Sequence, residues 1–238
     1  MGIEIYPSVE VFSNWQRKAK QVENFQGFLP DNSNFIRNLQ ELEKYESLYT
    51  DVPYELVTKE EYSWGGQGTK KFKDFTELCK HFHKNPLEIR DGIVVQKFIP
   101  VADDYKLLIM GDYNYVMQRF NPNGFVKNTT IGGRWENLTF DDLSPDVQAF
   151  CYEVLEHSGF PFIYLDILVA PERTYLLEVG LTSEHWSPKT KTTYNSISRD
   201  EFGRMCFEYL KNFYLPGTEL EVHENIPWRG DIYDDSRK

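Results

Sequence analysis

Two apolar segments in the C-terminal half of the chain read FIYLDILV (residues 162–169) and TYLLEV (residues 174–179), and each is interrupted by one carboxylate. The interrupting residues are Asp166 and Glu178. If the intervening residues 171–173 (PER) form a hairpin loop, the two carboxylates face each other across an antiparallel strand pair. Two bare carboxylates at that spacing repel each other. Mg²⁺ removes the repulsion, because proteins bind this ion through one or two carboxylates together with substrate phosphates. The strand pair therefore indicates a divalent metal site.

A glycine-rich turn in the N-terminal half of the chain reads WGGQGT (residues 64–69). Its residues Gly65, Gly66 and Gly68 allow close backbone approach and leave N–H groups available to anions. Lys59 comes shortly before the turn and can add a compact positive charge. An ordinary hairpin turn is the alternative interpretation of this motif. Together with the carboxylate pair, the turn indicates a site for phosphates and the metal ions bound to them.

Composition narrows the class of protein. The chain has 238 residues, a hydrophobic fraction of 40% and a formal net charge of −11. This length can bury a core, and the acidic balance argues against a nucleic-acid or anionic-membrane surface. No apolar run reaches the roughly 20 residues that span a bilayer, and the N-terminus carries no signal peptide. Cys79, Cys151 and Cys206 are scattered and odd in number, which indicates reduced thiols. We therefore expect a cytoplasmic protein without nucleic-acid or membrane partners.

The pattern of apolar residues predicts a mixture of helices and strands with several hairpins. Helices are expected from Ser33 through Tyr45, from Asp74 to Lys84, from Ser144 to Gly159 and from Ser198 onward, and strands over residues 54–59, 71–72, 93–99, 106–110 and 113–120 beside the two carboxylate strands. A glycine-containing loop is expected around residues 128–134. Because hairpins predominate, the pattern favours an α+β fold with largely antiparallel sheets over a doubly wound parallel sheet.

Several other residues could serve such a site. Residues 96–99 (QKFI) end a strong strand, and their main chain could bind an adenine edge; a plain core strand is the alternative. Arg119 and Lys106 lie near the ends of neighbouring predicted strands and could contact a phosphoryl group, although each alone is typical of a surface cation. A buried salt bridge to Arg119 or Lys106 is the alternative interpretation of Asp166, because an unpaired buried charge is costly.

This ordered set of residues resembles the ATP-grasp superfamily, in particular its carboxylate–amine ligases of the ribosomal-protein glutamate ligase and D-alanine–D-alanine ligase type. The matching segments are PYELVTK (53–59), SWGGQG (63–68), QKFI (96–99), DYK (104–106), QR (118–119), Asn128 with GG (132–133), LDIL (165–168) and LEV (177–179). The resemblance runs from about Tyr6 to Trp186. It implies an α+β fold in which two subdomains with largely antiparallel sheets grip the nucleotide between them.

The resemblance also implies ATP and Mg²⁺ as cofactors and a role for each matched residue. Asp166 and Glu178 would bind the metal, and Arg119 and Lys106 would act in catalysis. The residues that would bind the nucleotide are Lys59, Gly65, Gly66, Gln67, Gly68, Gln96, Lys97, Phe98, Ile99 and Asp104. In such ligases ATP phosphorylates a carboxylate, and an amine then displaces phosphate from the acyl phosphate to form an amide or peptide bond. The protein acts by positioning and charge neutralisation, so no nucleophilic side chain is expected.

Three features differ from the family pattern. Gly180 stands where the family has a metal-binding Asn, and Lys106 replaces the Arg of an Asp-x-Arg motif. The chain also starts almost where the nucleotide domain starts, so we expect either that another copy or a partner chain supplies part of the acceptor site or that the acceptor is itself a macromolecule. The expected organisation is a linker segment (1–30), a small subdomain with a glycine-rich lid (31–99), a large subdomain with the metal-binding hairpin (100–215) and a charged tail (216–238).

A carboxylate–amine ligase with an unidentified carboxylate donor and an amine acceptor, for which a peptide or protein is one candidate, is the favoured hypothesis. Two alternatives remain at this point. One is an ATP-grasp kinase that phosphorylates a hydroxyl group of a small molecule. The other is an ATP-binding module with weakened or no catalysis that acts as an interaction protein, which the glycine at position 180 favours.

Overall fold

The protein is described from a computed structural model. The described residues are 17–49, 52–63, 65–100, 102–111, 113–128 and 131–180, with Arg204, Glu208, Tyr209, Lys211 and Asn212. Trp64, the predicted loop around residues 182–196, most of the helix expected from Ser198, and the tail lie outside them. Every strand pair in the described part of the chain is antiparallel, which confirms the predicted α+β class. No helix within these ranges has the length and apolar character that a bilayer crossing requires.

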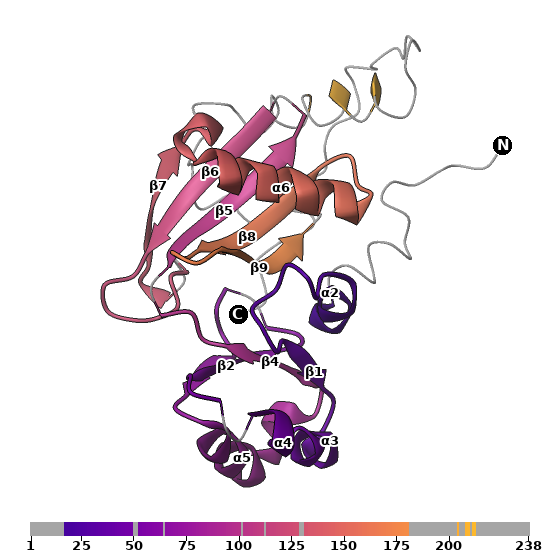
Figure 1. The fold of residues 1–238 in the computed structure, drawn as a ribbon, viewed down its shortest axis with the longest axis vertical. Coiled ribbons are helices and arrows are strands. Elements are labelled where there is room, and N and C mark those ends of the chain that lie inside the picture. The colour runs from indigo at the N-terminus through magenta and orange to yellow at the C-terminus, as the bar shows by residue number, and fades with distance from the viewer. Residues whose placement is uncertain are drawn as a thin grey trace, which may run out of the picture.

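In the first sheet, the residues within the ranges given above form four strands in the order β1-β4-β2-β3. Its elements are β1 (Asn34–Ile36), α3 (Leu39–Lys44), α4 (Glu46–Tyr49), β2 (Leu56–Glu60), β3 (Thr69–Phe72), α5 (Phe75–Lys84), the 3-10 helix η1 (Pro86–Ile89) and β4 (Ile93–Lys97). The helices pack on one face of the sheet and bury a core with it (Figure 1). Val57 and Lys59 of β2 lie on the face of the sheet opposite this core and point away from the helices.

The described residues of the second sheet form five strands in the order β7-β6-β5-β8-β9. Its elements are β5 (Asp103–Met110), β6 (Tyr113–Phe120), β7 (Arg134–Leu138), the 3-10 helix η3 (Phe140–Asp142), α6 (Pro145–Ser158), β8 (Ile163–Val169) and β9 (Thr174–Gly180). Figure 1 shows α6 lying across one face of this sheet, where Val147, Cys151 and Val154 join its apolar core. The opposite face carries the polar side chains of Asp104, Lys106 and Asp166 beside a second apolar cluster that contains Leu108, Met110 and Tyr164.

A short helix, α2 (Lys18–Asn24), contacts both sheets and lies between them in Figure 1. It contacts β1 and β4 of the first sheet and β9 of the second. The main chain that follows it also borders β9, because the Leu176 N–H donates to the Phe28 carbonyl at 2.8 Å. This helix falls inside residues 1–30, which the sequence analysis named a linker segment and for which it predicted no helix.

Most predicted elements are present. The hairpin turning at Gly111, the helix capped by Asp74 and the helix that begins after Ser144 and ends at Gly159 are confirmed. The strand predicted over residues 93–99 is shorter and ends at Lys97.

Two predictions of secondary structure were wrong. The helix expected from Ser33 begins only at Leu39, because residues 34–36 pair with β4 and the Asn38 side chain caps the helix by accepting the Glu41 N–H at 2.9 Å. Strand β7 was missed, since four of its five residues are exposed and show no apolar alternation. The predicted boundary between residues 99 and 100 falls in the segment that joins the two sheets.

The core of the first sheet provides a test of this packing. Phe82 is 1% exposed and its ring lies 5.9 Å from that of Phe72, whereas Leu87 is 79% exposed. We expect Phe82→Ala to lower the free energy of unfolding by about 3–5 kcal/mol, because it leaves a cavity. The control Leu87→Ala should change it by less than about 0.5 kcal/mol. Denaturant unfolding measures both, and equal effects would contradict the described core.

Candidate functional site

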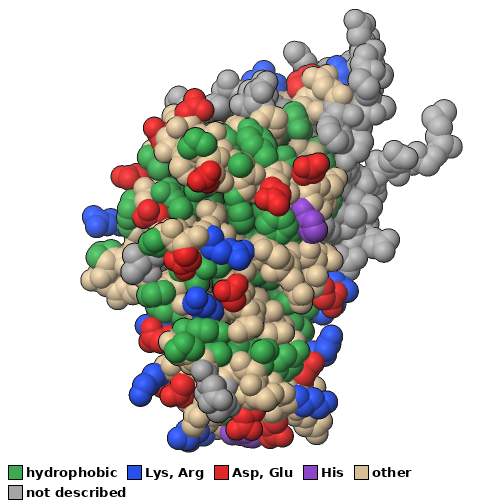
Figure 2. Space-filling model, viewed as in Figure 1, with side chains coloured by type: hydrophobic (Ala, Val, Ile, Leu, Met, Phe, Trp, Pro, Cys, Tyr) green, Lys and Arg blue, Asp and Glu red, His purple; other side chains and the backbone are tan. Residues whose placement is uncertain are grey.

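A cavity of about 910 Å³ lies between the two sheets. Figure 2 shows side chains of both charge signs at mid-height on one face of the molecule, between its upper and lower parts. The predicted site residues that line the cavity are Lys59, Gly65, Gly66, Gln67, Gln96, Lys97, Phe98, Ile99, Asp104, Lys106, Arg119, Asp166 and Glu178. Gly68 is not among the lining residues. A Cβ atom at Gly68 would lie 2.7 Å from a carboxylate oxygen of Glu60, so this glycine lets the turn pack on its own strand.

Asp166 and Glu178 are cross-strand partners, as the sequence predicted, but a register shift is needed to pair them. Nearer the hairpin loop Ile167 pairs with Leu176, whereas Asp166 pairs with Glu178, so Leu177 is an extra residue on β9. Such a β-bulge changes which face of the sheet the following side chains occupy. Without it Asp166 would oppose Leu177, and Glu178 would turn toward the core under α6. The bulge therefore places both carboxylates on the cavity.

Arg119 joins two carboxylates on the floor of the cavity. Its Nε lies 2.5 Å from Oδ1 of Asp104 and its Nη1 lies 3.0 Å from Oδ2 of Asp166. Burial alone would lower the pKa of Arg119, but the two carboxylates outweigh it and raise that pKa. Burial raises the pKa of Asp104, and the neighbouring guanidinium opposes the increase. Lys106 is more distant, with its Nζ 3.7 Å from Oδ1 of Asp166.

These contacts are the salt bridges that the sequence offered as the alternative role of Asp166. They leave the Asp166 carboxylate 18% exposed at the cavity. Ion pairing and the predicted metal binding would therefore involve the same carboxylate, and one role does not exclude the other.

Glu178 has a different environment. Its carboxylate has no hydrogen bond or ion pair with any other described residue, although the charge of Lys59 lies close enough to interact with it. Within the described ranges no three His, Cys, Asp or Glu side chains group into a metal site of their own. Mg²⁺ does not require one, because one or two carboxylates plus phosphate oxygens suffice. The donor set of Asp166 and Glu178 therefore fits Mg²⁺ bound together with a phosphorylated ligand.

Lys59 enters the cavity from β2, opposite the carboxylate pair. Its Nζ donates to the Leu177 carbonyl, which belongs to the bulge, at 3.2 Å. Burial lowers the pKa of Lys59 to about 8, and the nearby charge of Glu178 opposes this decrease. An ammonium group that burial destabilises gains from an anionic partner, so the position suits a phosphate.

The glycine turn lies against the loop that follows β6. Gly65, Gly66 and Gly68 have positive φ angles of 66°, 78° and 73°, which glycine adopts without strain. A Cβ atom at Gly66 would lie 2.6 Å from Cγ1 of Val126. The turn can therefore contact the second sheet's loop closely only because this residue is glycine.

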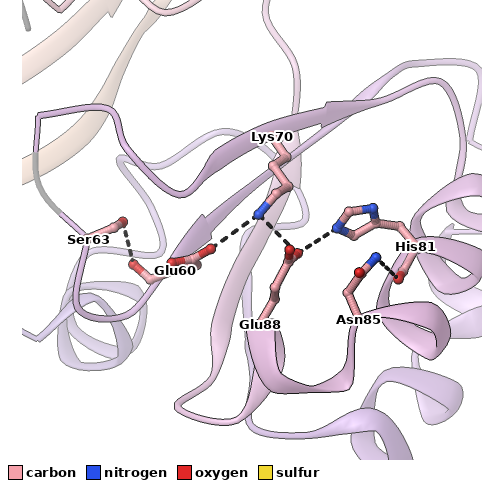
Figure 3. A network of polar contacts seen from close by, with 6 residues as sticks. All are labelled: Glu60, Ser63, Lys70, His81, Asn85 and Glu88. Atoms are coloured by element: carbon pink, nitrogen blue, oxygen red, sulfur yellow. Dashed lines mark hydrogen bonds and ion pairs between the residues drawn. The ribbon is translucent and has the colours of Figure 1, made fainter. Parts of the chain in front are cut away.

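A polar network fixes the strands that carry the glycine turn (Figure 3). Lys70, just after the turn, lies 3.2 Å from a carboxylate oxygen of Glu60 and 3.0 Å from one of Glu88. His81 of α5 reaches the same Glu88 carboxylate at 2.6 Å. The two strands are thus tied to each other and to the helices beneath them, while the turn itself projects over the cavity.

The segment after β4 presents main-chain groups and an aromatic wall. The Phe98 N–H donates to the Glu55 carbonyl at 2.8 Å, whereas the Ile99 N–H bonds to no described residue. The Phe98 ring meets the Phe125 ring edge-on at 5.9 Å. An unpaired N–H beside flat apolar surfaces fits a nucleobase, which offers a ring acceptor and a stacking face.

Sequence reasoning missed several lining residues. Lys18 and Gln21 on α2 line the cavity and are buried. Nζ of Lys18 donates to the carbonyls of Glu61 and Ser63 at 3.3 and 2.8 Å, at the base of the glycine turn. Lys127 lines the cavity as well and donates to the Ala102 carbonyl at 2.6 Å. Nothing in a short polar segment distinguishes these residues from surface positions until its packing is known.

Comparison with known proteins adds the fold relationship. No protein-family model matches the sequence, and no curated protein matches it. Solved structures do match. The ATP-grasp ligase PsnB in complex with its minimal precursor aligns with a TM-score of 0.57 at 15% identity, over 88% of this chain and 64% of that chain. D-alanine–D-alanine ligase from Bacillus anthracis aligns with a TM-score of 0.59 at 15% identity, over 83% and 68%.

A third similar structure is the RiPP-associated ATP-grasp ligase of Chryseobacterium gregarium in complex with ADP and a leader and core peptide. It aligns with a TM-score of 0.56 at 16% identity, over 84% of this chain and 62% of that chain. The chain therefore spans less than two thirds of the length of two of these three structures. At these identities the likeness establishes the fold. The chain has the ATP-grasp fold, with two α+β parts and antiparallel sheets.

The contact between Gly66 and Val126 can be tested by replacing each of two glycines with alanine. Gly66 and Gly132 both have positive φ, but a Cβ atom at Gly132 would meet nothing within 4 Å. We expect Gly66→Ala to push the turn off Val126 and speed hydrogen exchange of residues 65–69. Gly132→Ala carries similar backbone strain and should leave that exchange unchanged. Equal exchange in the two variants would contradict the described contact.

Proposed function

We propose that this chain is an ATP- and Mg²⁺-dependent ligase that joins a carboxylate to an amine. The observation that carries the proposal is one cavity, enclosed by the two sheets of an ATP-grasp fold, onto which Asp166 and Glu178 face together opposite Lys59. Arg119 and Lys106 add positive charge on the same floor. This is the charge distribution that a phosphoryl group with its metal ion requires.

The roles follow from position. Mg²⁺ and ATP, when bound, supply charge neutralisation and the phosphoryl group that activates the carboxylate. Asp166 and Glu178 would hold the metal, and Lys59 with the main-chain N–H groups of the glycine turn would hold the phosphates. The Ile99 N–H and the wall formed by Phe98 would orient the adenine.

The remaining positive charge acts on the reaction itself. Arg119 is held rigidly by Asp104 and Asp166, so its orientation is set before the substrate arrives. It would stabilise the oxygens of the acyl phosphate and of the tetrahedral species formed when the amine attacks. The glycine turn would exclude water, which otherwise competes with the amine for the acyl group.

We propose a peptide or protein as one of the two substrates. Two of the similar structures, PsnB and the Chryseobacterium gregarium enzyme, contain peptides, a precursor in one and a leader and core peptide in the other. The acyl donor and the amine acceptor of this chain would be identified by screening peptides against the nucleotide-bound protein.

An ATP-binding module without ligase activity is the second candidate. Gly180 favours it, because this position lines the cavity next to the carboxylate pair and contributes no side-chain ligand. Loss of one ligand weakens neutralisation of the phosphate charge more than it weakens nucleotide binding. Nucleotide binding without ADP release in the presence of all candidate substrates would support this second function.

Removing either carboxylate tests the metal assignment. We expect Asp166→Asn and Glu178→Gln each to weaken Mg²⁺-dependent binding of ATP about tenfold or more, since a neutral amide replaces a charged ligand. The control Asp141→Asn, at an exposed position of η3, should bind as wild type. Calorimetric titration with and without Mg²⁺ measures these affinities. Unchanged Mg²⁺-dependent affinity in both site variants would refute the metal site.

The pKa of Lys59 predicts the pH dependence of nucleotide binding. Because this pKa is about 8, the ammonium is charged at neutral pH and loses its proton as the pH rises through that value. A bound phosphate favours the charged form. Metal-free affinity for ADP should therefore fall about tenfold between about pH 7 and about pH 9, with proton uptake at the upper end.

The Lys59→Met variant serves as the control for this pH dependence. It should bind ADP weakly and with the same affinity at both pH values, because no titrating ammonium remains. Titration in two buffers with different ionisation enthalpies measures the proton uptake directly. A wild-type affinity that does not change over this range would show that Lys59 does not meet the phosphates.

A further inference from the structure

We infer that Gln21 of α2 is a positioning residue for Glu178, acting through the main chain of β9. The inference rests on the proposed metal site, because it assigns to Gln21 the task of holding one of its two carboxylates in place. Its basis is the β-bulge at Leu177 and the contacts that hold the strand on either side of that bulge.

The shifted register at the β-bulge requires contacts that hold it in place. A regular hairpin would continue the register of Ile167 with Leu176 and place Asp166 opposite Leu177. Among the described strands, β9 is the last of its sheet, and only β8 binds it there through a regular ladder. An edge strand with an extra residue has few hydrogen bonds of its own to maintain a shifted register. Contacts from outside the sheet must supply the rest.

Gln21 supplies two of these contacts. Its side-chain Nε2 donates to the Val179 carbonyl at 2.9 Å, and the Val179 N–H donates to its Oε1 at 3.0 Å. The amide therefore pairs with one residue of the edge strand in the way that a neighbouring strand would. Gln21 is 5% exposed, so water does not compete with these bonds. Val179 is the residue directly after Glu178.

A third contact holds the bulge from the other side. The Leu177 carbonyl accepts from Nζ of Lys59 at 3.2 Å, so the residues before and after Glu178 are both bound from outside the sheet. The contacts come from α2 and from β2, and α2 is itself anchored. The Ala19 N–H donates to the buried carboxylate of Glu61 at 3.0 Å. Gln21 therefore connects the base of the glycine turn to the strand that carries Glu178.

Loss of the Gln21 amide should act on Glu178 specifically. The Val179 N–H and carbonyl would lose their Gln21 partners in a buried place. Among the contacts of the described residues, the bulge would keep the ladder to β8, the bond from the Leu176 N–H to the Phe28 carbonyl and the bond from Lys59 to the Leu177 carbonyl. Asp166 lies on β8, between two strands, and keeps its ladder and its bond to Arg119. The expected result is a metal site with one well-placed and one poorly placed carboxylate, while the phosphate-binding residues remain intact.

The test compares Gln21→Met with a matched control. Methionine has a similar length and no hydrogen-bonding amide. The control is Gln148→Met on α6, because Nε2 of Gln148 also donates to main-chain carbonyls, those of Phe140 and Leu143, and this residue does not line the cavity. ADP is titrated into both variants and wild type with and without Mg²⁺, and the ratio of the two dissociation constants is measured.

We expect Gln21→Met to reduce the Mg²⁺-dependent gain in ADP affinity about tenfold and to leave the metal-free affinity near that of wild type. Gln148→Met should leave both unchanged, even if it lowers the melting temperature. Hydrogen exchange of residues 174–180 without nucleotide gives a second readout. The Val179 N–H should exchange faster in Gln21→Met only.

Any other result would contradict either the role of Gln21 or the proposed function. A Mg²⁺-dependent gain equal to that of wild type would overturn the role of Gln21 while leaving the proposed function intact. Equal losses in both variants would show a general loss of stability rather than positioning. If wild type itself shows no Mg²⁺-dependent binding, the proposed function fails, and the inference that rests on it fails too. The exchange rate of the Val179 N–H then still decides whether Gln21 holds the strand.

Discussion

Placing two carboxylates side by side on one cavity is the constraint on which the rest of this structure depends. Asp166 and Glu178 would repel each other, and neither can be buried without compensation. The fold meets this requirement by surrounding them with cations from three strands: Lys59 on β2, Lys106 on β5 and Arg119 on β6. Lys59 comes from the first sheet, and Lys106 and Arg119 come from the second. The cations therefore surround the carboxylates only because the two sheets face each other across the cavity.

Much of this arrangement could be predicted from the sequence. Apolar strands interrupted by one charge, a glycine-rich turn and capped helices have strong local signatures, and the strands, the hairpin turn at Gly111 and helices α5 and α6 were predicted from them. The cavity brings together nearly all of the residues chosen from the sequence. Order along the chain was informative because the ATP-grasp fold brings those segments together in that order.

The features that could not be predicted depend on packing. The pairing of Asp166 with Glu178 was expected from a simple hairpin, yet it results from a bulge, and a one-residue shift leaves no mark on composition or periodicity. Helix α2 has only two turns and a polar sequence, so its role between the sheets emerges only from its contacts. Strand β7 lies at an exposed edge, where alternation of apolar residues is not required.

The position of α2 has a consequence for the self-association of the protein. Within the part of the chain that the structure describes, β9 is an edge strand, and Gln21 and Phe28 bond to main-chain groups on its outer side. An uncovered edge is a template for pairing with another chain. The residues before the first sheet therefore protect the protein against self-association. A shortened chain that began at the first sheet would expose an open strand edge at the hairpin that carries Asp166 and Glu178, and would tend to aggregate whatever the cavity binds.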